Sequence, residues 1–404
     1  MPLDQRELSS IAQTILSGQG FKGTATDQYE KLLLSELSAK YVCCFPSGRS
    51  GFYFLIKALF KPGDEVILSA YSFALFVRIF HEQGIKPVIV DVNREDALIN
   101  PELIEEKITK NTKGILVTHL FGNPCDMQKI CFLSRKYNLH LLEDCAHAFG
   151  SSYQGRSVGS FGTAGIFSTS PMKIPTTLGG GFVVTNDQKL YETMKGALQS
   201  DPGYQYSLNK FLKIITFTLI YYLNSFPAIF SLLSSQIFRY LKLKNPGALR
   251  KLFYSELIVQ KPFDPFERSI LTNMQASVGL VQLNKKDEMI SRQRDHARIL
   301  NEAFKDSKVI TPFVEKKGEF NNFLYYIIRL PYDAESFVDQ ALLKGLYLMR
   351  ENVWNCNDFA FAQDYRQVCP VAKEIQPLLV RLPNSSLLSD KHIEKVISIV
   401  KEII

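Results

Sequence analysis

The chain lacks the features that mark secreted, metal-stapled or repetitive proteins. Its 404 residues include seven cysteines, at positions 43, 44, 125, 131, 145, 356 and 369, and none of them forms a CxxC pair. A disulfide scaffold or a structural zinc site is therefore not expected. The opening MPLDQRELSS has no apolar signal-peptide core, and no repeat period is visible. We expect a cytoplasmic, multidomain globular protein with no bound metal.

Acidic residues are nearly absent from one segment. Residues 203–261 hold eight lysines or arginines and one glutamate, and they account for the whole net charge of +7. Positions 214–238 form a run of 25 residues without a formal charge. Pro227 disfavours one straight spanning helix. Two interpretations stay open: interfacial helices that bind an anionic membrane surface through 210–251, or a buried interface with a partner subunit. Base-stacking motifs are missing, so no nucleic-acid partner is expected.

Between about residue 40 and residue 200, short apolar runs alternate with helical stretches. We expect strands at 66–71, 87–92, 114–121, 139–144, 165–169 and 181–187, and helices at 101–110 and 126–137. Such alternation is typical of βαβ units and of a largely parallel sheet covered by helices on both faces. Ligands of these sheets lie at the carboxyl ends of the strands.

The pattern after the insert differs. Helical periodicity runs through 269–304, a strand is expected at 323–330, and the chain closes with a helix in SDKHIEKVISIVKEII. We therefore expect the chain to have three parts: residues 1–202, a large ligand-binding domain; residues 203–266, the apolar basic insert and candidate membrane-surface element; and residues 267–404, a helix leading to a small C-terminal domain.

Two motifs place reactive side chains at expected strand ends. LLEDCAHAFG ends a strand at Asp144, with His147 three residues later, and FSTSPMK puts Lys173 shortly after another strand. Read alone, Asp144 can equally cap a following helix, and a solitary lysine is usually a solvated surface group. A lysine in a desolvated pocket, however, can form a Schiff base with an aldehyde. The glycine-rich TTLGGGFVV that follows lets the backbone approach a ligand.

A third motif, FPSGRSGFYFLIKAL at 45–59, opens an apolar helix with a Ser/Gly turn. Exposed N–H groups at a helix N-terminus bind phosphate, although many helices begin this way. An aldehyde trap, a phosphate cup and an acid together suit pyridoxal 5'-phosphate (PLP). The acid would keep the pyridine nitrogen protonated, so that the ring withdraws electrons from the substrate.

These motifs resemble those of the DegT/DnrJ/EryC1/StrS family, fold type I PLP-dependent aminotransferases that act mostly on keto-sugar nucleotides. The resemblance runs through ILSGQGFKGTATDQYEKLL, GDEVILSAYSFAL, VTHLFGNPCDM, NMQASVGLVQL and CPVAKEIQPLLVRLPNSSLLSDKHIEKV, and it omits 203–261. It implies an α/β fold, with a large domain around a mostly parallel sheet and a smaller C-terminal α/β domain. It also implies a homodimer and ping-pong transfer of an amino group, from glutamate to a keto-sugar nucleotide used for surface polysaccharide.

The resemblance assigns roles to matching positions. Lys173 would be the Schiff-base lysine and proton shuttle, and Asp144 the partner of the pyridine nitrogen. His147 stands where the family often has Gln beside the cofactor ring, and it can make the same hydrogen bond. Phe73 in AYSFAL would stack on the ring, although core packing is the simpler reading of that residue alone. The remaining candidates would hold the cofactor phosphate: Gly48, Arg49, Ser50 and Ser168.

The sequence also departs from the family pattern. Gly179 replaces the acid of the family's GEGG, and the loop that reaches the partner's phosphate site aligns near Arg268. These departures leave two alternatives open: a PLP enzyme acting on a lipid-linked or membrane-held substrate, and a non-catalytic PLP-binding protein. Because Lys173 is retained, the family's dehydratase branch is disfavoured. His119 and Arg350 could face substrate, or be a core histidine and a surface charge.

Overall fold

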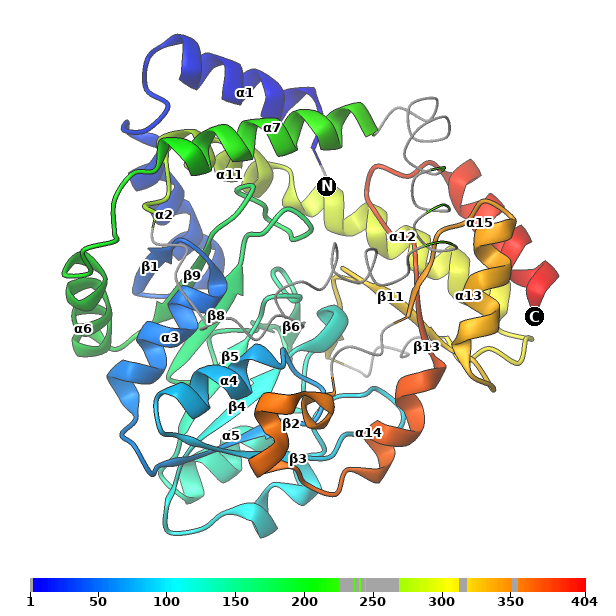
Figure 1. Cartoon of the computed structure of the whole chain (residues 1–404), viewed down its shortest axis with the longest axis horizontal. Helices are drawn as coiled ribbons and strands as arrows, with labels where there is room; N and C mark the ends of the chain where they lie inside the picture. The colour runs from blue at the N-terminus through cyan, green and yellow to red at the C-terminus, as the bar shows by residue number, and fades with distance from the viewer. Residues whose placement is uncertain are drawn as a thin grey trace.

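A seven-stranded sheet in the order β1-β9-β8-β5-β4-β2-β3 forms the centre of the molecule (Figure 1). The computed structural model describes residues 3–224, 269–311, 318–350 and 355–404, with single positions at 236, 240 and 244. The strands are β1 (Tyr41–Phe45), β2 (Glu65–Ser69), β3 (Lys86–Val90), β4 (Thr112–Thr118), β5 (His140–Asp144), β8 (Ala164–Ser168) and β9 (Gly181–Thr185). Pairing is parallel from β3 across to β8 and antiparallel from β8 to β9 and β1. The predicted, largely parallel sheet is confirmed.

Side chains alternate along β1 and β9, so each of these strands contributes to two hydrophobic layers. Val42, Phe182 and Val184 pack with α2 (Ala25–Leu37) and α11 (Asn273–Asn284). Cys43 and Val183 point the other way, into the main core. The helices of the α/β layers around that core are α3 (Gly48–Leu59), α4 (Leu75–Glu82), α5 (Met127–Lys136) and α6 (Gln188–Gln199). The sheet is therefore covered on both faces, as predicted.

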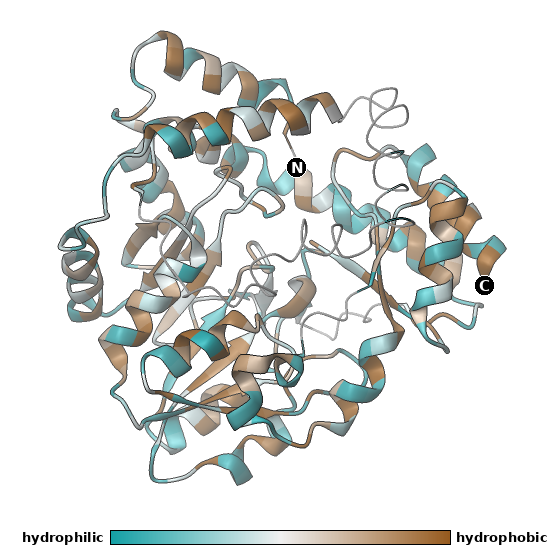
Figure 2. Ribbon diagram, viewed as in Figure 1, coloured by the Kyte–Doolittle hydropathy of each residue, from teal (hydrophilic) through white to brown (hydrophobic). Residues whose placement is uncertain are grey.

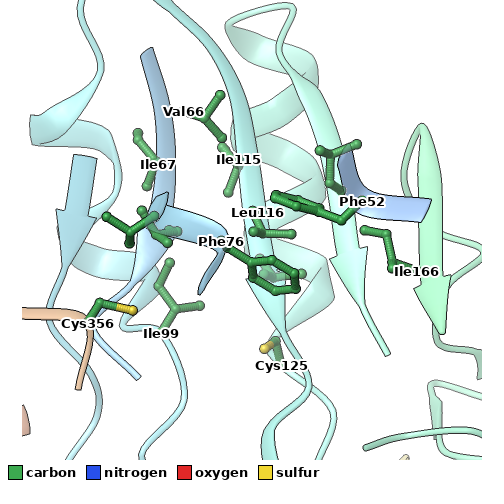
Figure 3. Packing of buried hydrophobic residues seen from close by; sticks show 14 of the residues in the cluster. Phe52, Val66, Ile67, Phe76, Ile99, Ile115, Leu116, Cys125, Ile166 and Cys356 are labelled. Atoms are coloured by element: carbon green, nitrogen blue, oxygen red, sulfur yellow. The ribbon is translucent and has the colours of Figure 1, made fainter. Parts of the chain in front are cut away.

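The main core is densely packed with apolar side chains. The rings of Phe52 and Phe76 lie 4.1 Å apart, centroid to centroid, and Figure 3 shows them against the strand that carries Ile115 and Leu116. Cys356 from the C-terminal third joins the same cluster. Residues of the C-terminal third therefore pack directly against the central sheet.

Two local predictions are wrong. The segment 101–110 is not an α-helix but two short 3-10 turns, η1 (Pro101–Leu103) and η2 (Glu105–Lys107). Ile108 is already extended, because β4 begins at Thr112 and leaves no length for a helix. The strand expected at 114–121 ends at Thr118, where the turn η3 (Leu120–Gly122) begins with Phe121 in the left-handed region. The helix predicted at 126–137 is confirmed as α5.

A smaller sheet, β11-β13-β12, lies in the C-terminal third. Its strands are β11 (Tyr326–Arg329), β12 (Met349–Arg350) and β13 (Leu379–Leu382). They share a second apolar cluster with α12 (Lys286–Phe304), α13 (Ala334–Leu343) and α15 (Asp390–Ile403). The helix expected over 269–304 is divided at Lys285 into α11 and α12. A further short sheet contains β6 (Ser152–Tyr153), β7 (Arg156–Ser157) and β10 (Glu319–Phe320), and α14 (Pro370–Ile375) precedes β13.

Helix α7 (Leu208–Asn224) makes up most of the part of the insert that the structure describes. It runs alongside α1 (Gln5–Leu16) and α11 (Figure 1). Ile214 of α7 is buried in one cluster with Ile11, Met274 and Val278. Among the described residues, no helix combines the length and apolarity that crossing a membrane requires. Pro227, and Arg268 with its predicted anion contact, lie outside the described residues.

Candidate active site

A cavity of about 470 Å³ opens at the carboxyl ends of the parallel strands. Ligands of open α/β sheets bind at this edge. The predicted site residues that line the cavity are Gly48, Arg49, Phe73, Asp144, His147, Ser168 and Lys173. The structure therefore gathers residues that the sequence spreads over more than a hundred positions.

Asp144 ends β5 and is 3 % exposed. Burial raises the pKa of its carboxyl, and this rise is opposed by the Ala146 N–H, by Lys173 and by a hydrogen bond with Thr118. The Ala146 N–H donates to Asp144 Oδ1 at 3.1 Å. No helix begins here, so the helix-cap interpretation is wrong. A buried carboxylate of this kind gains from a cationic partner, and a protonated pyridine nitrogen is such a partner.

Lys173 is half-buried in the cavity wall rather than solvated on a helix surface. Its Nζ donates to the Tyr325 hydroxyl at 3.4 Å and lies 5.2 Å from the centre of the Tyr325 ring. Tyr325 is the residue just before β11, and its backbone N–H donates to the Phe121 carbonyl at 3.3 Å. Sequence reasoning missed Tyr325, because FLYYIIRL signals only a strand.

His147 is buried beside Lys173, and its ring orientation is fixed by the backbone. The Phe121 N–H donates to His147 Nδ1 at 3.2 Å, so the hydrogen of the neutral ring sits on Nε2. Burial lowers the pKa of His147 well below its usual value, and the charges of Lys173 and Arg381 lower it further. The ring also meets Tyr325 edge to face at 4.9 Å. A neutral histidine with a donor at Nε2 can make the hydrogen bond expected of the family's Gln.

The predicted phosphate cup is formed where α3 meets the ends of β8 and β9. Ser47 caps α3, accepting from the Ser50 N–H at 3.1 Å. A Cβ at Gly181 would lie 2.4 Å from the Gly48 nitrogen, so glycine is what allows this approach. Ser168 adds a hydroxyl from the end of β8. Ser50 itself is fully buried and does not line the cavity, so the structure places it as a support of the cup.

Phe73 is half-buried on the cavity wall and meets Phe76 edge to face, with ring centres 5.5 Å apart. This contact with a second aromatic ring holds the Phe73 side chain at the cavity wall, where it can stack on a flat ligand. Lining residues that the sequence did not single out are Thr118, Lys210 and Lys213.

His119 is a core histidine and Arg350 a surface charge, and neither faces the cavity. His119 is fully buried, with Nε2 3.3 Å from Glu143 Oε2 and Nδ1 accepting from the Cys125 N–H at 3.0 Å. Arg350 pairs with Asp333 and Glu335 at the surface, each at 3.3 Å. Both side chains are engaged in contacts away from the cavity, and neither lines it.

Gly179, in place of the family acid, has a φ of +130°. The Gln275 side chain donates to its carbonyl at 2.7 Å. The loop is therefore tied to α11 through its backbone, and a side chain with a Cβ would be strained at this position.

A lysine and a buried acid at the carboxyl edge of an α/β sheet, facing a helix N-terminus built for phosphate, define a fold type I PLP enzyme. The family model for DegT/DnrJ/EryC1/StrS aminotransferases matches residues 2–214 and 241–401. The chain belongs to this family, and it is a PLP-dependent aminotransferase. The non-catalytic alternative is thereby set aside.

Relatives of known name are similar along almost their whole length. The GDP-perosamine synthase of Escherichia coli O157:H7 is 26% identical over 375 residues, covering 92% of this chain and 88% of the relative. The dTDP-3-amino-3,6-dideoxy-alpha-D-galactopyranose transaminase of Aneurinibacillus thermoaerophilus is 27% identical over 407 residues, covering 98% and 95%. The solved aminotransferase TlmJ of Streptoalloteichus hindustanus superposes with a TM-score of 0.78 at 22% identity, covering 99% of this chain and 96% of that one. This likeness confirms the fold.

Proposed function

We propose that the enzyme moves an amino group from an amino acid, glutamate, to the keto group of a nucleotide-linked sugar, for surface polysaccharide. The observation that carries the proposal is the placement of Lys173 and Asp144 in one cavity at the strand ends. The names of the two curated relatives support the substrate class, since both describe amino-sugar nucleotides. PLP, when bound, supplies an electron-withdrawing ring that stabilises the carbanion and carries the amino group between the two half-reactions.

The residues divide the work by their positions. Lys173 holds the cofactor and then moves the proton at its Nζ, next to the Tyr325 hydroxyl. Asp144, buried at the end of β5, would hold a proton on the ring nitrogen. His147, with its hydrogen on Nε2, would donate to an oxygen of the ring, and Phe73 on the cavity wall would stack on the ring. The phosphate is held by the cup residues Gly48, Arg49 and Ser168, with Ser50 behind them.

The donor carboxylate has a candidate partner in Arg381 of β13. Its guanidinium lies 4.4 Å from the centre of the Tyr325 ring, and its charge reaches His147. Arg381 and Tyr325 line a second cavity of about 290 Å³ that also contacts Met172 and Ile174, on either side of Lys173. Guanidinium groups bind carboxylates bidentately. We infer that this cavity receives the donor's carboxylate.

The direct test is an assay for the aminated product. The purified enzyme, with PLP and L-glutamate, is incubated with keto-sugar nucleotides, and mass spectrometry follows replacement of the keto oxygen by an amino group. Lys173→Ala is the control and should give no product. If glutamate is consumed in the half-reaction but every keto-sugar nucleotide stays unchanged, the sugar assignment fails and the lipid-linked substrate becomes the better reading.

We also propose a homodimer with the three-part organisation 1–202, 203–266 and 267–404, in which the insert rests on an anionic membrane from the cytoplasmic side. Apolar residues recur along the α7 ribbon (Figure 2), and some of their side chains are buried whereas others are exposed. The exposed ones are Leu208, Leu212, Phe217, Leu219, Ile220 and Leu223. Exposed apolar patches of this kind mark membrane or protein contacts, and the excess of basic residues over 203–261 favours an anionic surface.

Flotation with anionic and neutral vesicles tests the membrane proposal. The double variant Leu212→Glu/Leu219→Glu should lose binding to anionic vesicles. Leu343→Glu on α13, where the leucine is 68% exposed, is the matched control and should float like the wild type. A wild-type protein that stays out of both vesicle types, and a double variant that turns from dimer to monomer, would instead make this face the subunit interface.

A further inference from the structure

Helix α7 turns one face toward the active-site cavity. Its residues on the cavity wall follow the helical spacing i, i+3, i+4, i+7 and i+8: Lys210, Lys213, Ile214, Phe217 and Thr218. One continuous helix face therefore closes the cavity on the side of α3. Ile214 is buried against α1 and α11, which fixes this orientation. Part of the insert is thus a wall of the catalytic cavity.

Lys210 on that face is placed against the usual pattern of a surface helix. Such a helix buries its apolar residues and points its charges into water. In α7 Lys210 is half-buried in the cavity wall while Leu212 and Leu219 are exposed. Lys213, three residues further along, also lines the cavity but is exposed. Because Lys210 lines the cavity while leucines of the same helix are exposed, we infer that its charge serves a ligand in the cavity.

The place that Lys210 reaches is the phosphate cup. Its Nζ donates to the Pro46 carbonyl at 3.4 Å, immediately before Ser47 and the first turn of α3. The positive end of the α3 dipole repels an ammonium group there. Arg49 adds a further cation on the same wall. A phosphate bound at this helix N-terminus would lie within reach of both cations as well as of the backbone N–H groups.

The charge balance of the cavity favours the same conclusion. Among the described residues that line it, the cationic side chains are Arg49, Lys173, Lys210 and Lys213, and the acidic side chain is Asp144. Asp144 ends β5, whereas Lys210 contacts the segment before α3. The α7 sequence, LNKFLKIITFTLIYYLN, contains no acid. The wall formed by α3 and α7 is therefore suited to a multiply charged anion.

We propose that Lys210, assisted by Lys213, forms with the α3 N-terminus a phosphate-ester site supplied by the insert of the same chain. Two phosphate sources fit this chemistry. One is the phosphate of PLP, which the position of Lys210 beside Pro46 favours. The other is the diphosphate of a nucleotide-linked sugar, and this source rests on the proposed function.

The test compares ligands that differ by the phosphate alone. Affinities for PLP and for pyridoxal, which lacks the phosphate, are measured by absorbance titration at low salt. Lys210→Met, which keeps the apolar stem, should weaken PLP binding about ten- to a hundred-fold and leave pyridoxal binding within about twofold. Lys210→Arg should restore most of the PLP affinity, and Lys213→Met should have a smaller effect. Lys189→Met on α6, exposed and outside the cavity, is the control.

A second arm identifies the source. GDP and dTDP are titrated into the PLP-loaded enzyme and its variants by calorimetry. A loss of nucleotide affinity in Lys210→Met with unchanged PLP affinity would keep the site and assign it to the substrate's diphosphate. If PLP and nucleotide affinities both stay within about twofold of wild type in Lys210→Met and Lys213→Met, the proposal is overturned. Pyridoxal binding at Lys173 in the same titrations shows that the variants are folded, independently of any keto-sugar activity.

Discussion

The ammonium of Lys173 lies 3.4 Å from the hydroxyl of Tyr325, a residue 152 positions further along the chain. Lys173 follows β8 of the central sheet, while Tyr325 leads into β11 of the small sheet. Because the two side chains come from different sheets, the packing between those sheets sets the position of the reactive nitrogen. We therefore expect the small sheet to orient Lys173 for catalysis.

Removal of the Tyr325 hydroxyl should slow proton transfer without removing the cofactor. We expect Tyr325→Phe to lower kcat about ten- to a hundred-fold, because a hydrogen bond to a charged group is lost. The ring stays in place, so the affinity for PLP should change little. Stopped-flow absorbance with L-glutamate measures the rate, and a PLP titration measures the affinity. An unchanged rate would show that the contact with Lys173 has no catalytic role.

Asp144→Asn separates catalysis from stability. Asn can still accept from the Ala146 N–H but carries no charge, so it cannot hold a proton on the ring nitrogen. The rate of amino transfer from glutamate should fall about 10²- to 10³-fold. The raised pKa of Asp144 shows that its buried charge is unfavourable in the cofactor-free protein, so thermal stability in that form should not decrease. A wild-type rate of amino transfer in Asp144→Asn would contradict the assignment of Asp144 to the ring nitrogen.

His147 should make the cofactor-free protein sensitive to acid. Its pKa is lowered well below 6.5 in the folded protein, chiefly by burial, so the unfolded chain binds more protons below that pH. The free energy of unfolding therefore falls as the pH decreases, by up to about 1.4 kcal/mol per pH unit from this one group. His147→Gln removes the contribution. Urea unfolding at about pH 7 and pH 5 should show a smaller loss for the variant, and equal losses would refute the buried neutral state.

Arg381 should set the apparent affinity for the amino donor. Arg381→Ala is expected to raise the KM for glutamate about ten- to a hundred-fold, since a charged hydrogen bond to a carboxylate is lost. Arg381→Lys should recover part of this affinity, because lysine keeps the charge without the planar fork. Arg350→Ala, which removes a surface arginine of the same sheet, is the control and should behave as wild type. Steady-state kinetics with varied glutamate concentration provide the comparison.

Sequence reasoning found the parts of the site that are local in the chain. Asp144, Ser168 and Lys173 stand at or just after strand ends, and strand ends can be read from apolar runs. Parallel strands carry their carboxyl ends to one edge, so these residues had to converge. Helix 101–110 failed as a prediction because composition does not reveal how soon the next strand must begin.

The sequence could not predict that Tyr325, Arg381 and one face of α7 lie at the site. Tyr325 and Arg381 line the second cavity because the small sheet packs beside Lys173, and their motifs signal strands alone. Lys210 and Lys213 were visible as basic residues beside an apolar run. Nothing in that pattern told which face of the helix would meet the cavity, since this depends on the contact of Ile214 with α1 and α11.

The central claim is that Lys173 and Asp144 carry an amino-transfer reaction on PLP. The most direct measurement is the absorbance spectrum of the purified enzyme before and after L-glutamate, with Lys173→Ala beside it. We predict a visible band from PLP joined to a lysine, bleached by glutamate to the pyridoxamine phosphate form and missing in Lys173→Ala. A band that persists in Lys173→Ala, or no band even after PLP is added to the wild type, would contradict this account.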